Sequence, residues 1–309
     1  NIIWILADDF GLPDVGCYGG VYRTPALDGL ASGGTRFDFC FAAPLCAPSR
    51  AMCMFGRYGF RTGVRDNGQG AAATPQREVC IAKVLKQAGY ATAVAGKWSD
   101  LEYLVTAEDG RRWGFDQFMI WGERWEEGGG RSRYWGPDYN HNGMIISGDK
   151  RTFGPDLLQK FAVDFIRQNR EGPFFLYYPT PLIHYKLQRT PDSSGGEPDL
   201  HADNIAYLDK LWSNLQAVAK TASAPQLLYQ ELDISLRVLR DFVNEETGAI
   251  QVDSRENFQM LTEFGSQYMP SVLRFTYLRC IVFEQSPKYI FFVLICFCHH
   301  TLNNIVSKL

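Results

Sequence analysis

Short apolar segments alternate along the first two thirds of the chain with longer segments whose apolar residues recur at helical spacing. The short segments are typical of buried β-strands, and the longer ones of amphipathic helices. This alternation predicts a mainly parallel sheet covered by helices on both sides, a three-layer α/β/α sandwich. The predicted strands are residues 1–7, 35–41, 90–95, 114–118 and 173–178, and the predicted helices are residues 24–31, 75–88, 155–169 and 203–211.

The first predicted strand ends on two adjacent carboxylates, Asp8 and Asp9. In open α/β sheets, ligands bind at the carboxyl ends of the strands. Carboxylate oxygens are the ligands that a hard divalent cation such as Ca²⁺ or Mg²⁺ prefers. The pair therefore predicts a metal site, and the alternative reading of these two residues is a solvated pair in a loop.

A cysteine stands at the predicted start of another helix. Residues 44–50 read Pro-Leu-Cys-Ala-Pro-Ser-Arg, in which Pro48 suits a first helical turn and Ser49 can satisfy a free backbone N–H. The unpaired N–H groups and the helix dipole make such a position attractive to anions, and Arg50 adds a planar cation. The alternative is that Cys46 is a buried structural cysteine.

The run from Cys46 to Arg50, followed by Gly56-Arg57, resembles the signature of the type I sulfatases in the alkaline phosphatase superfamily. The resemblance covers about residues 1–211. It implies that Cys46 is oxidised to Cα-formylglycine by a formylglycine-generating or anaerobic sulfatase-maturating enzyme. It also implies that Asp8, Asp9 and the modified Cys46 bind a Ca²⁺ or Mg²⁺ ion.

Two further segments resemble sulfatase motifs. The resemblance implies that Lys97 holds a sulfate oxygen and stabilises the leaving oxygen. The family motif continues with His or Gln two residues later, where this chain has Ser99. His184 is implied to protonate the leaving alcohol or to bind the sulfate, because histidine titrates near neutrality; the alternative is a loop histidine satisfied by the backbone. His141 and His201 lack such a context and are expected at the surface.

One sulfatase element is missing from the sequence. In the family, a Ser-Asp-Asn/His-Gly segment beyond the helix at residues 203–211 completes the metal site, and this chain has none. Residues 66–68, Asp-Asn-Gly, precede that helix and are predicted to form a turn. We therefore expect a sulfatase-like catalytic domain at residues 1–212. The tail at residues 213–309 has no recognisable motif, which a frameshift, a truncation, a misjoined exon or an insertion would explain.

Composition narrows the possible partners. The 309 residues have a formal net charge of −3, which does not indicate a nucleic acid or an anionic membrane as partner. Eight cysteines are too few and too irregularly spaced for a disulfide framework in a chain of this length. No apolar stretch reaches the ~20 residues of a membrane-spanning helix. The family resemblance implies a periplasmic or secreted protein.

The hypothesis is a sulfuric ester hydrolase that cleaves sulfate monoesters of a sulfated carbohydrate or an aryl alcohol. Arg50 and Lys97 would stabilise the sulfuryl oxygens, and His184 would protonate the leaving group. The aromatic, glycine-rich segment of residues 121–139 is expected to face the substrate. Three alternatives stay open. Two are a catalytically impaired sulfatase-like chain that lacks half its metal site and a phosphate or phosphonate ester hydrolase of the same superfamily. The third is an α/β scaffold without this chemistry, against which the order of the five motif pieces argues.

Overall fold

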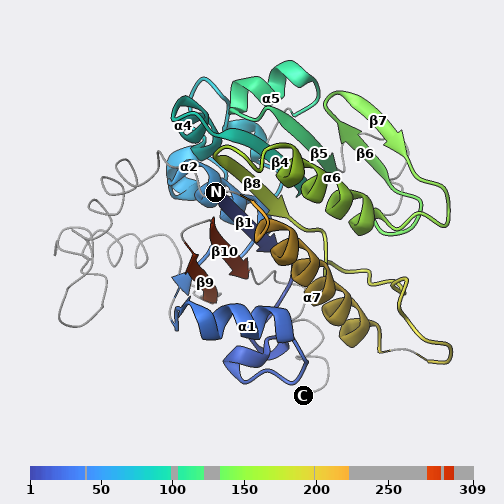
Figure 1. The fold of residues 1–309 in the computed structure, drawn as a ribbon. Coiled ribbons are helices and arrows are strands. Elements are labelled where there is room, and N and C mark those ends of the chain that lie inside the picture. Colours follow the sequence, from blue (N-terminus) through green and yellow to red (C-terminus); the bar gives the residue numbers. More distant parts are fainter. Residues whose placement is uncertain are drawn as a thin grey trace, which may run out of the picture. The chain divides into compact units, whose positions relative to one another are not determined.

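The structure is a computed structural model that describes residues 1–38, 40–98, 104–121, 133–197, 199–222, 277–286 and 289–295. The strands are β1 (Ile2–Ala7), β2 (Thr35–Arg36), β3 (Cys40–Phe41), β4 (Ala91–Lys97), β5 (Gln117–Trp121), β6 (Asp138–His141), β7 (Met144–Ser147), β8 (Phe174–Pro179), β9 (Tyr277–Ser286) and β10 (Tyr289–Ile295). The α-helices are α1 (Pro25–Gly33), α2 (Cys46–Phe55), α3 (Gly59–Thr62), α4 (Ile81–Gln87), α5 (Ala107–Trp113), α6 (Gly154–Gln168) and α7 (Leu200–Ala219) (Figure 1).

The centre of the sheet is parallel, as the sequence predicts. The strand order is β2-β9-β10-β1-β8-β4-β5-β6-β7, and β3 pairs with β9. The pairs β10–β1, β1–β8, β8–β4 and β4–β5 are parallel, whereas β6, β7 and β9 pair in antiparallel fashion. All six side chains of β8 are buried, which explains why this strand is an unbroken apolar run.

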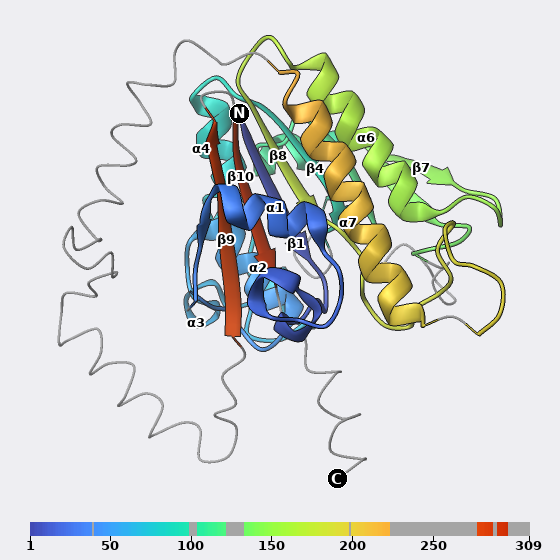
Figure 2. The ribbon, with the colours of Figure 1, turned by 60° about the horizontal axis from the view of Figure 1, so that its bottom comes forward.

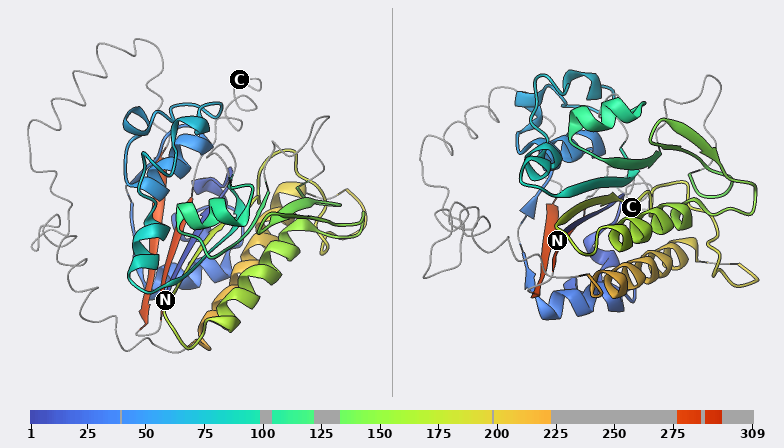
Figure 3. Two further views of the ribbon diagram at one scale, coloured as in Figure 1. Left: turned by 90° about the horizontal axis from the view of Figure 1, so that it is seen from above. Right: turned by 45° about the horizontal axis from the view of Figure 1, so that its top comes forward.

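Helices cover both faces of the sheet (Figure 3). On one face, α6 packs against β4 and β8, and α7 packs against both α6 and α1. On the other face, α4 packs against β4, α5 against β5 and α2 against α4. The predicted α/β class is thereby confirmed. Trp212 of α7 is fully buried and meets the ring of Phe10 edge-to-face at 5.9 Å, which anchors α7 on the segment after β1.

Helix α1 begins where the sequence predicts but is capped from a distant element. The side chain of Thr24, the expected cap, makes no capping hydrogen bond. Instead, the carboxylate of Asp209 in α7 accepts the backbone N–H groups of Ala26 and Leu27 at 2.9 and 3.0 Å. These are two of the donors that a helix start leaves unpaired, so α7 supplies the cap across the sequence.

Helix α4 is shorter than the predicted helix at residues 75–88. The carbonyl of Thr74 accepts the N–H groups of Arg77 and Glu78 in a tight turn, so the regular helix starts only at Ile81. The apolar spacing of residues 75–88 does not reveal this turn. The turn is accompanied by an ion pair between the buried carboxylate of Glu78 and Arg57, at 2.7 Å, and Arg57 belongs to an earlier segment of the chain.

Helix α7 is longer than the predicted one at residues 203–211. Asp199 caps it by accepting the N–H groups of His201 and Ala202, and the helix continues to Ala219. The domain boundary expected near Trp212 therefore falls inside a regular helix. The division into residues 1–212 and a separate tail stays a prediction.

Part of the tail joins the sheet. β10 lies beside β1 in parallel register from Ile2 opposite Ile290 to Ala7 opposite Ile295, and β9 pairs with β10 (Figure 2). The sequence shows no clean periodicity there, because a strand of a parallel sheet need not alternate. Among the described residues, no helix combines the length and the apolar character needed to span a membrane.

Candidate active site

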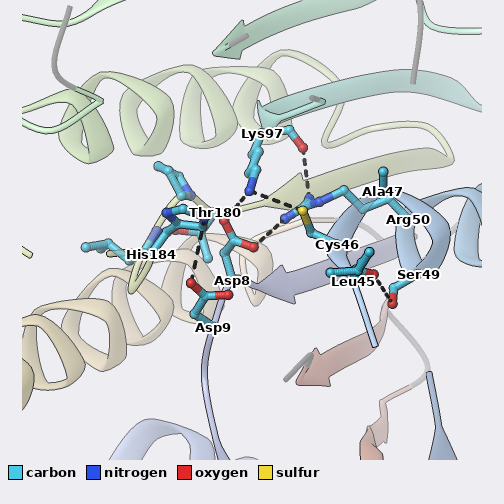
Figure 4. A network of polar contacts seen from close by, with 12 residues as sticks. Asp8, Asp9, Leu45, Cys46, Ala47, Ser49, Arg50, Lys97, Thr180 and His184 are labelled. Atoms are coloured by element: carbon cyan, nitrogen blue, oxygen red, sulfur yellow. Dashed lines mark hydrogen bonds and ion pairs between the residues drawn. The ribbon is translucent and has the colours of Figure 1, made fainter. Parts of the chain in front are cut away.

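The predicted site residues meet at one edge of the sheet. Asp8 and Asp9 follow β1, Lys97 ends β4, and His184 lies in the loop after β8. Because β1, β8 and β4 are adjacent parallel strands, their carboxyl ends lie at the same edge. The start of α2 brings Cys46 and Arg50 to this edge (Figure 4).

Asp8 is the centre of a buried ionic cluster. It is 1% exposed, and its two carboxylate oxygens bind Arg50 at 3.1 Å and Lys97 at 2.9 Å. Burial opposes the ionisation of Asp8, but the charges of Lys97 and Arg50 outweigh that effect and hold its pKa well below its usual range. Burial would likewise lower the pKa of Lys97, and the carboxylate of Asp8 reverses the shift and raises it. All three groups are therefore charged at neutral pH.

Cys46 is the first residue of α2 and is 4% exposed. Its Sγ lies 3.6 Å from the Nζ of Lys97. Sequence reasoning placed Cys46 at a helix start, and the structure adds that the ammonium group of Lys97 faces the thiol. The same ammonium bridges Cys46 and Asp8, so the cysteine belongs to the ionic cluster (Figure 4).

Asn67 is a site residue that sequence reasoning missed. The predicted turn at residues 66–68 does form, but it delivers the Asn67 side chain to the start of α2. Its Oδ1 accepts the backbone N–H of Ala47 at 3.1 Å and lies 3.4 Å from the Sγ of Cys46. The only signal in the sequence was the turn itself, which says nothing about what the side chain contacts.

At the start of α2, the structure changes the expected role of Ser49 and adds contacts for Arg50. Ser49 makes no capping hydrogen bond: its hydroxyl lies 2.9 and 2.8 Å from the carbonyl oxygens of Ala43 and Leu45, which share its single proton. Arg50 is 1% exposed, and its guanidinium donates to the carbonyl of Lys97 at 2.8 Å as well as to Asp8. Arg50 thus ties α2 to the ends of β1 and β4, in addition to supplying positive charge.

His184 and Asp9 form the other side of the site. The Nε2 of His184 lies 3.7 Å from a carboxylate oxygen of Asp9, and its Nδ1 lies 2.6 Å from the carbonyl of Tyr185 and contacts Arg133. Burial, with the charges of Lys97 and Arg133 adding to it, lowers the pKa of His184 to about 4. The imidazole is therefore neutral at pH 7, in contrast to the near-neutral titration expected from sequence.

The backbone holds Asp9 in an unusual conformation. Its φ is 57°, in the left-handed region that a non-glycine residue seldom adopts. The backbone N–H of Asp8 donates to the carbonyl of Leu182 at 3.1 Å, and the carbonyl of Asp8 accepts the N–H of Ile183 at 2.7 Å. These two hydrogen bonds join the end of β1 to the loop that carries His184. Such strain is held in place by surrounding structure and is common at functional sites.

The described residues supply only part of a divalent metal site. Asp8 and Asp9 offer carboxylate oxygens, but both oxygens of Asp8 already bind cations. Within the described ranges, no group of three or more His, Cys, Asp or Glu side chains could hold a metal ion. Ca²⁺ takes about six to eight oxygen ligands. The set expected from sequence, Asp8, Asp9 and Cys46, is therefore incomplete without further ligands.

Other sequence expectations fare differently. His201 is half-buried rather than at the surface, since its Nε2 lies 2.8 Å from the carboxylate of Asp14. His141 is also partly buried, with its ring against Phe161. Ser99 and most of the expected substrate-facing segment, residues 122–132, lie outside the described residues.

Comparisons with known proteins point to one family. The family model named Sulfatase matches residues 1–244. Human arylsulfatase D is 28% identical over 297 residues, which cover 68% of this chain and 49% of that protein. The N-acetylglucosamine-6-O-sulfatase of Bacteroides thetaiotaomicron is 31% identical over 198 residues, which cover 63% of this chain and 32% of that protein. The chain thus spans half or less of the length of these relatives.

Solved structures show the same fold. The crystal structure of Ps i-CgsB is 27% identical, with a TM-score of 0.60 over 71% of this chain and 55% of that one. A complex of Ps i-CgsB with k-i-k-neocarrahexaose gives a TM-score of 0.59 at the same identity and coverage. The structure of BT4656 in complex with its substrate D-glucosamine-2-N,6-O-disulfate has a TM-score of 0.50 at 22% identity, covers 79% of this chain and 55% of that one, and shares the fold.

Proposed function

This chain belongs to the sulfatase family, and from that premise we propose that it hydrolyses sulfate monoesters of a carbohydrate or an aryl alcohol. The observation that supports this function most is the buried cluster of Asp8, Arg50 and Lys97 around Cys46. A sulfate ester at Cys46 would meet the N-terminus of α2 and the ammonium group of Lys97, both of which favour an oxyanion.

We propose that Cys46 is the precursor of Cα-formylglycine. At residue 46, the hydrated aldehyde would offer one hydroxyl for attack on sulfur, with loss of the alcohol, and a second hydroxyl whose deprotonation would re-form the aldehyde and release the sulfate. The groups next to Sγ are suited to orient hydroxyls, because Asn67 offers an acceptor at 3.4 Å and Lys97 a cationic donor at 3.6 Å. A formylglycine-generating or anaerobic sulfatase-maturating enzyme would be the partner that carries out the oxidation.

The chain's own residues would divide the remaining work. Lys97 stays charged and would bind a sulfuryl oxygen. Arg50 would add positive charge for the sulfuryl oxygens and holds α2 against the ends of β1 and β4. His184 is neutral at pH 7 and would first bind the ester oxygen by a hydrogen bond. A bound sulfate adds negative charge beside the imidazole, which raises its pKa. Proton delivery to the leaving alkoxide would therefore be coupled to substrate binding.

Asp8 and Asp9 are the residues that we propose for a Ca²⁺ or Mg²⁺ ion. When bound, such an ion would offset charge on the sulfate and lower the pKa of a neighbouring hydroxyl. The other ligands would have to come from outside the described residues, and none of the residue roles above depends on the ion. A sulfated small molecule or glycan as substrate, and a periplasmic or secreted location, complete the proposal.

Aryl sulfate hydrolysis tests the function. Cys46→Ala should abolish turnover of 4-nitrophenyl sulfate and leave the urea unfolding midpoint close to that of the parent chain. Cys53→Ala, in the same helix but outside the ionic cluster, should keep the activity. Mass spectrometry of the Cys46 peptide should show the aldehyde in the active preparation. Activity that survives Cys46→Ala would contradict the proposal.

A catalytically impaired sulfatase-like protein is the second candidate. The observation that favours it is the incomplete metal site among the described residues. Such a protein would bind 4-nitrophenyl sulfate in calorimetry and release no nitrophenol, even when Cys46 is converted and Ca²⁺ is added. Turnover under these conditions would exclude this candidate.

A further inference from the structure

A cleft lies next to His184, between residues 133–134 and residues 185–188. It has a volume of about 360 Å³ and is lined by Arg133, Tyr134, Tyr185, Lys186 and Gln188. This volume lies within the range of pockets that hold small ligands, roughly 300 to 1,000 Å³. No lining residue is acidic, whereas two are cationic.

The cleft is fixed relative to the proposed reaction centre. The hydroxyl of Tyr134 donates to the carbonyl of His184 at 2.6 Å, and the guanidinium of Arg133 contacts the imidazole of His184. Arg133 also lies over the ring of Trp121, at 4.6 Å from its centroid, which orients the cation. A group bound here would therefore be a near neighbour of a group bound at His184.

Lys186 gives the cleft its available charge. It is exposed, and no carboxylate of the described residues forms an ion pair with it. The neighbouring Tyr185 is 57% exposed, so its ring offers a face on which a sugar ring can stack. Two cations beside an exposed aromatic ring match an oxyanion attached to a saccharide.

We propose that this cleft binds a second anionic group, a sulfate or a carboxylate, on a saccharide whose scissile sulfate ester lies at His184. The inference rests on the proposed function and adds a substrate class to it: saccharides with two anions, in preference to those with one. Lys186 is the residue that distinguishes the two classes, because it is not part of the ionic cluster around Cys46.

Calorimetric binding to the Cys46→Ala chain tests the preference without turnover. The ligands are glucosamine 6-sulfate, glucosamine 2-N,6-O-disulfate and a disaccharide of uronic acid and glucosamine 6-sulfate. The second sulfate or the carboxylate should tighten binding about tenfold over the monosulfate, as one charge-assisted contact does. The dianionic ligand that binds more tightly than the monosulfate identifies whether the cleft takes a sulfate or a carboxylate. Added salt should reduce this difference in affinity.

Lys186→Met should reduce the ratio of dissociation constants to near one, and Lys186→Arg should restore it. Lys220→Met is the matched control, because Lys220 lies far from the cleft. The side chain of Asn204 in α7 donates to the carbonyl of Gln188, which lines the cleft, and Lys220 follows Asn204 by 16 positions, a rise of roughly 24 Å along the helix. The control should keep the full ratio. Equal affinities of the parent chain for all three ligands, or an equal loss in Lys220→Met, would overturn the inference.

Aryl sulfate turnover by the parent chain, with Cys46 in place, separates the two proposals. Hydrolysis of 4-nitrophenyl sulfate without a preference for dianions would leave the sulfatase function standing and reject the cleft. A preference for dianions without hydrolysis would support the cleft as a binding site and reject catalysis by this chain.

Discussion

The amide oxygen of Asn67 lies 3.4 Å from the Sγ of Cys46 and accepts the N–H of Ala47 at 3.1 Å, although 21 positions separate Asn67 from Cys46. Leu45, which precedes α2, has no side chain that can cap the helix. Asn67 therefore caps α2 from another loop, and the same oxygen orients the side chain of Cys46, the first residue of the helix.

Asn67→Ala should destabilise the chain by about 1 kcal/mol, the usual loss on removal of a helix cap. It should also change the rate at which Cys46 is alkylated in the folded protein, because the thiol loses its acceptor. Urea unfolding and iodoacetamide kinetics measure the two effects. Asn67→Asp keeps an acceptor at the helix start and should retain the stability. An alkylation rate in Asn67→Ala equal to that of the parent chain would show that Asn67 does not orient residue 46.

Asp8→Asn should destabilise the chain by about 3 kcal/mol, because Arg50 and Lys97 would remain buried without a counter-charge. The matched control is Asp164→Asn, which breaks an exposed ion pair with Lys160 and should cost less than about 1 kcal/mol. Urea unfolding near pH 7 measures both. Equal losses in the two variants would mean that the buried cluster contributes no more than a surface pair.

Asp9→Asn should weaken Ca²⁺ binding in calorimetry and leave the fold intact. Asparagine tolerates the left-handed backbone that Asp9 adopts at a φ of 57°, so the change removes charge without adding strain. An unchanged Ca²⁺ isotherm would exclude Asp9 as a metal ligand. The far-UV circular dichroism spectrum of the variant serves as the control for folding.

The pair of His201 and Asp14 should make stability depend on pH. The hydrogen bond to Asp14 raises the pKa of His201 above its ordinary value of 6.5. The proton is bound more tightly in the folded chain, so the stabilisation is fully present below about pH 6.5 and is lost as the pH rises through the raised pKa.

His201→Gln gives the measurement for this pair. The difference in unfolding free energy between the parent chain and the variant should be larger at about pH 5.5 than at about pH 8.5. Taking the difference at each pH removes the contribution of every other titrating group. A difference that grows toward high pH would mean that the pair is not charged in the folded state.

The sequence alone determined the features that depend on neighbouring residues. An unbroken apolar run followed by Asp8 and Asp9 predicts a buried strand with carboxylates at its end, and the parallel register of β1 with β8 agrees. The helix start at Cys46 was also predictable from local residues. The alternation of such segments was sufficient for the α/β class, because it reflects how each element buries its own apolar face.

Only the tertiary structure decided which distant groups meet. Asp209 rather than Thr24 caps α1, Asn67 reaches Cys46, and β10 lies beside β1. Burial in the assembled fold also decided that His184 is neutral at pH 7. These features depend on the path of the chain through space, which brings together groups that local propensity and periodicity treat as unrelated. Desolvation and contact with fixed charges arise only once that path has closed.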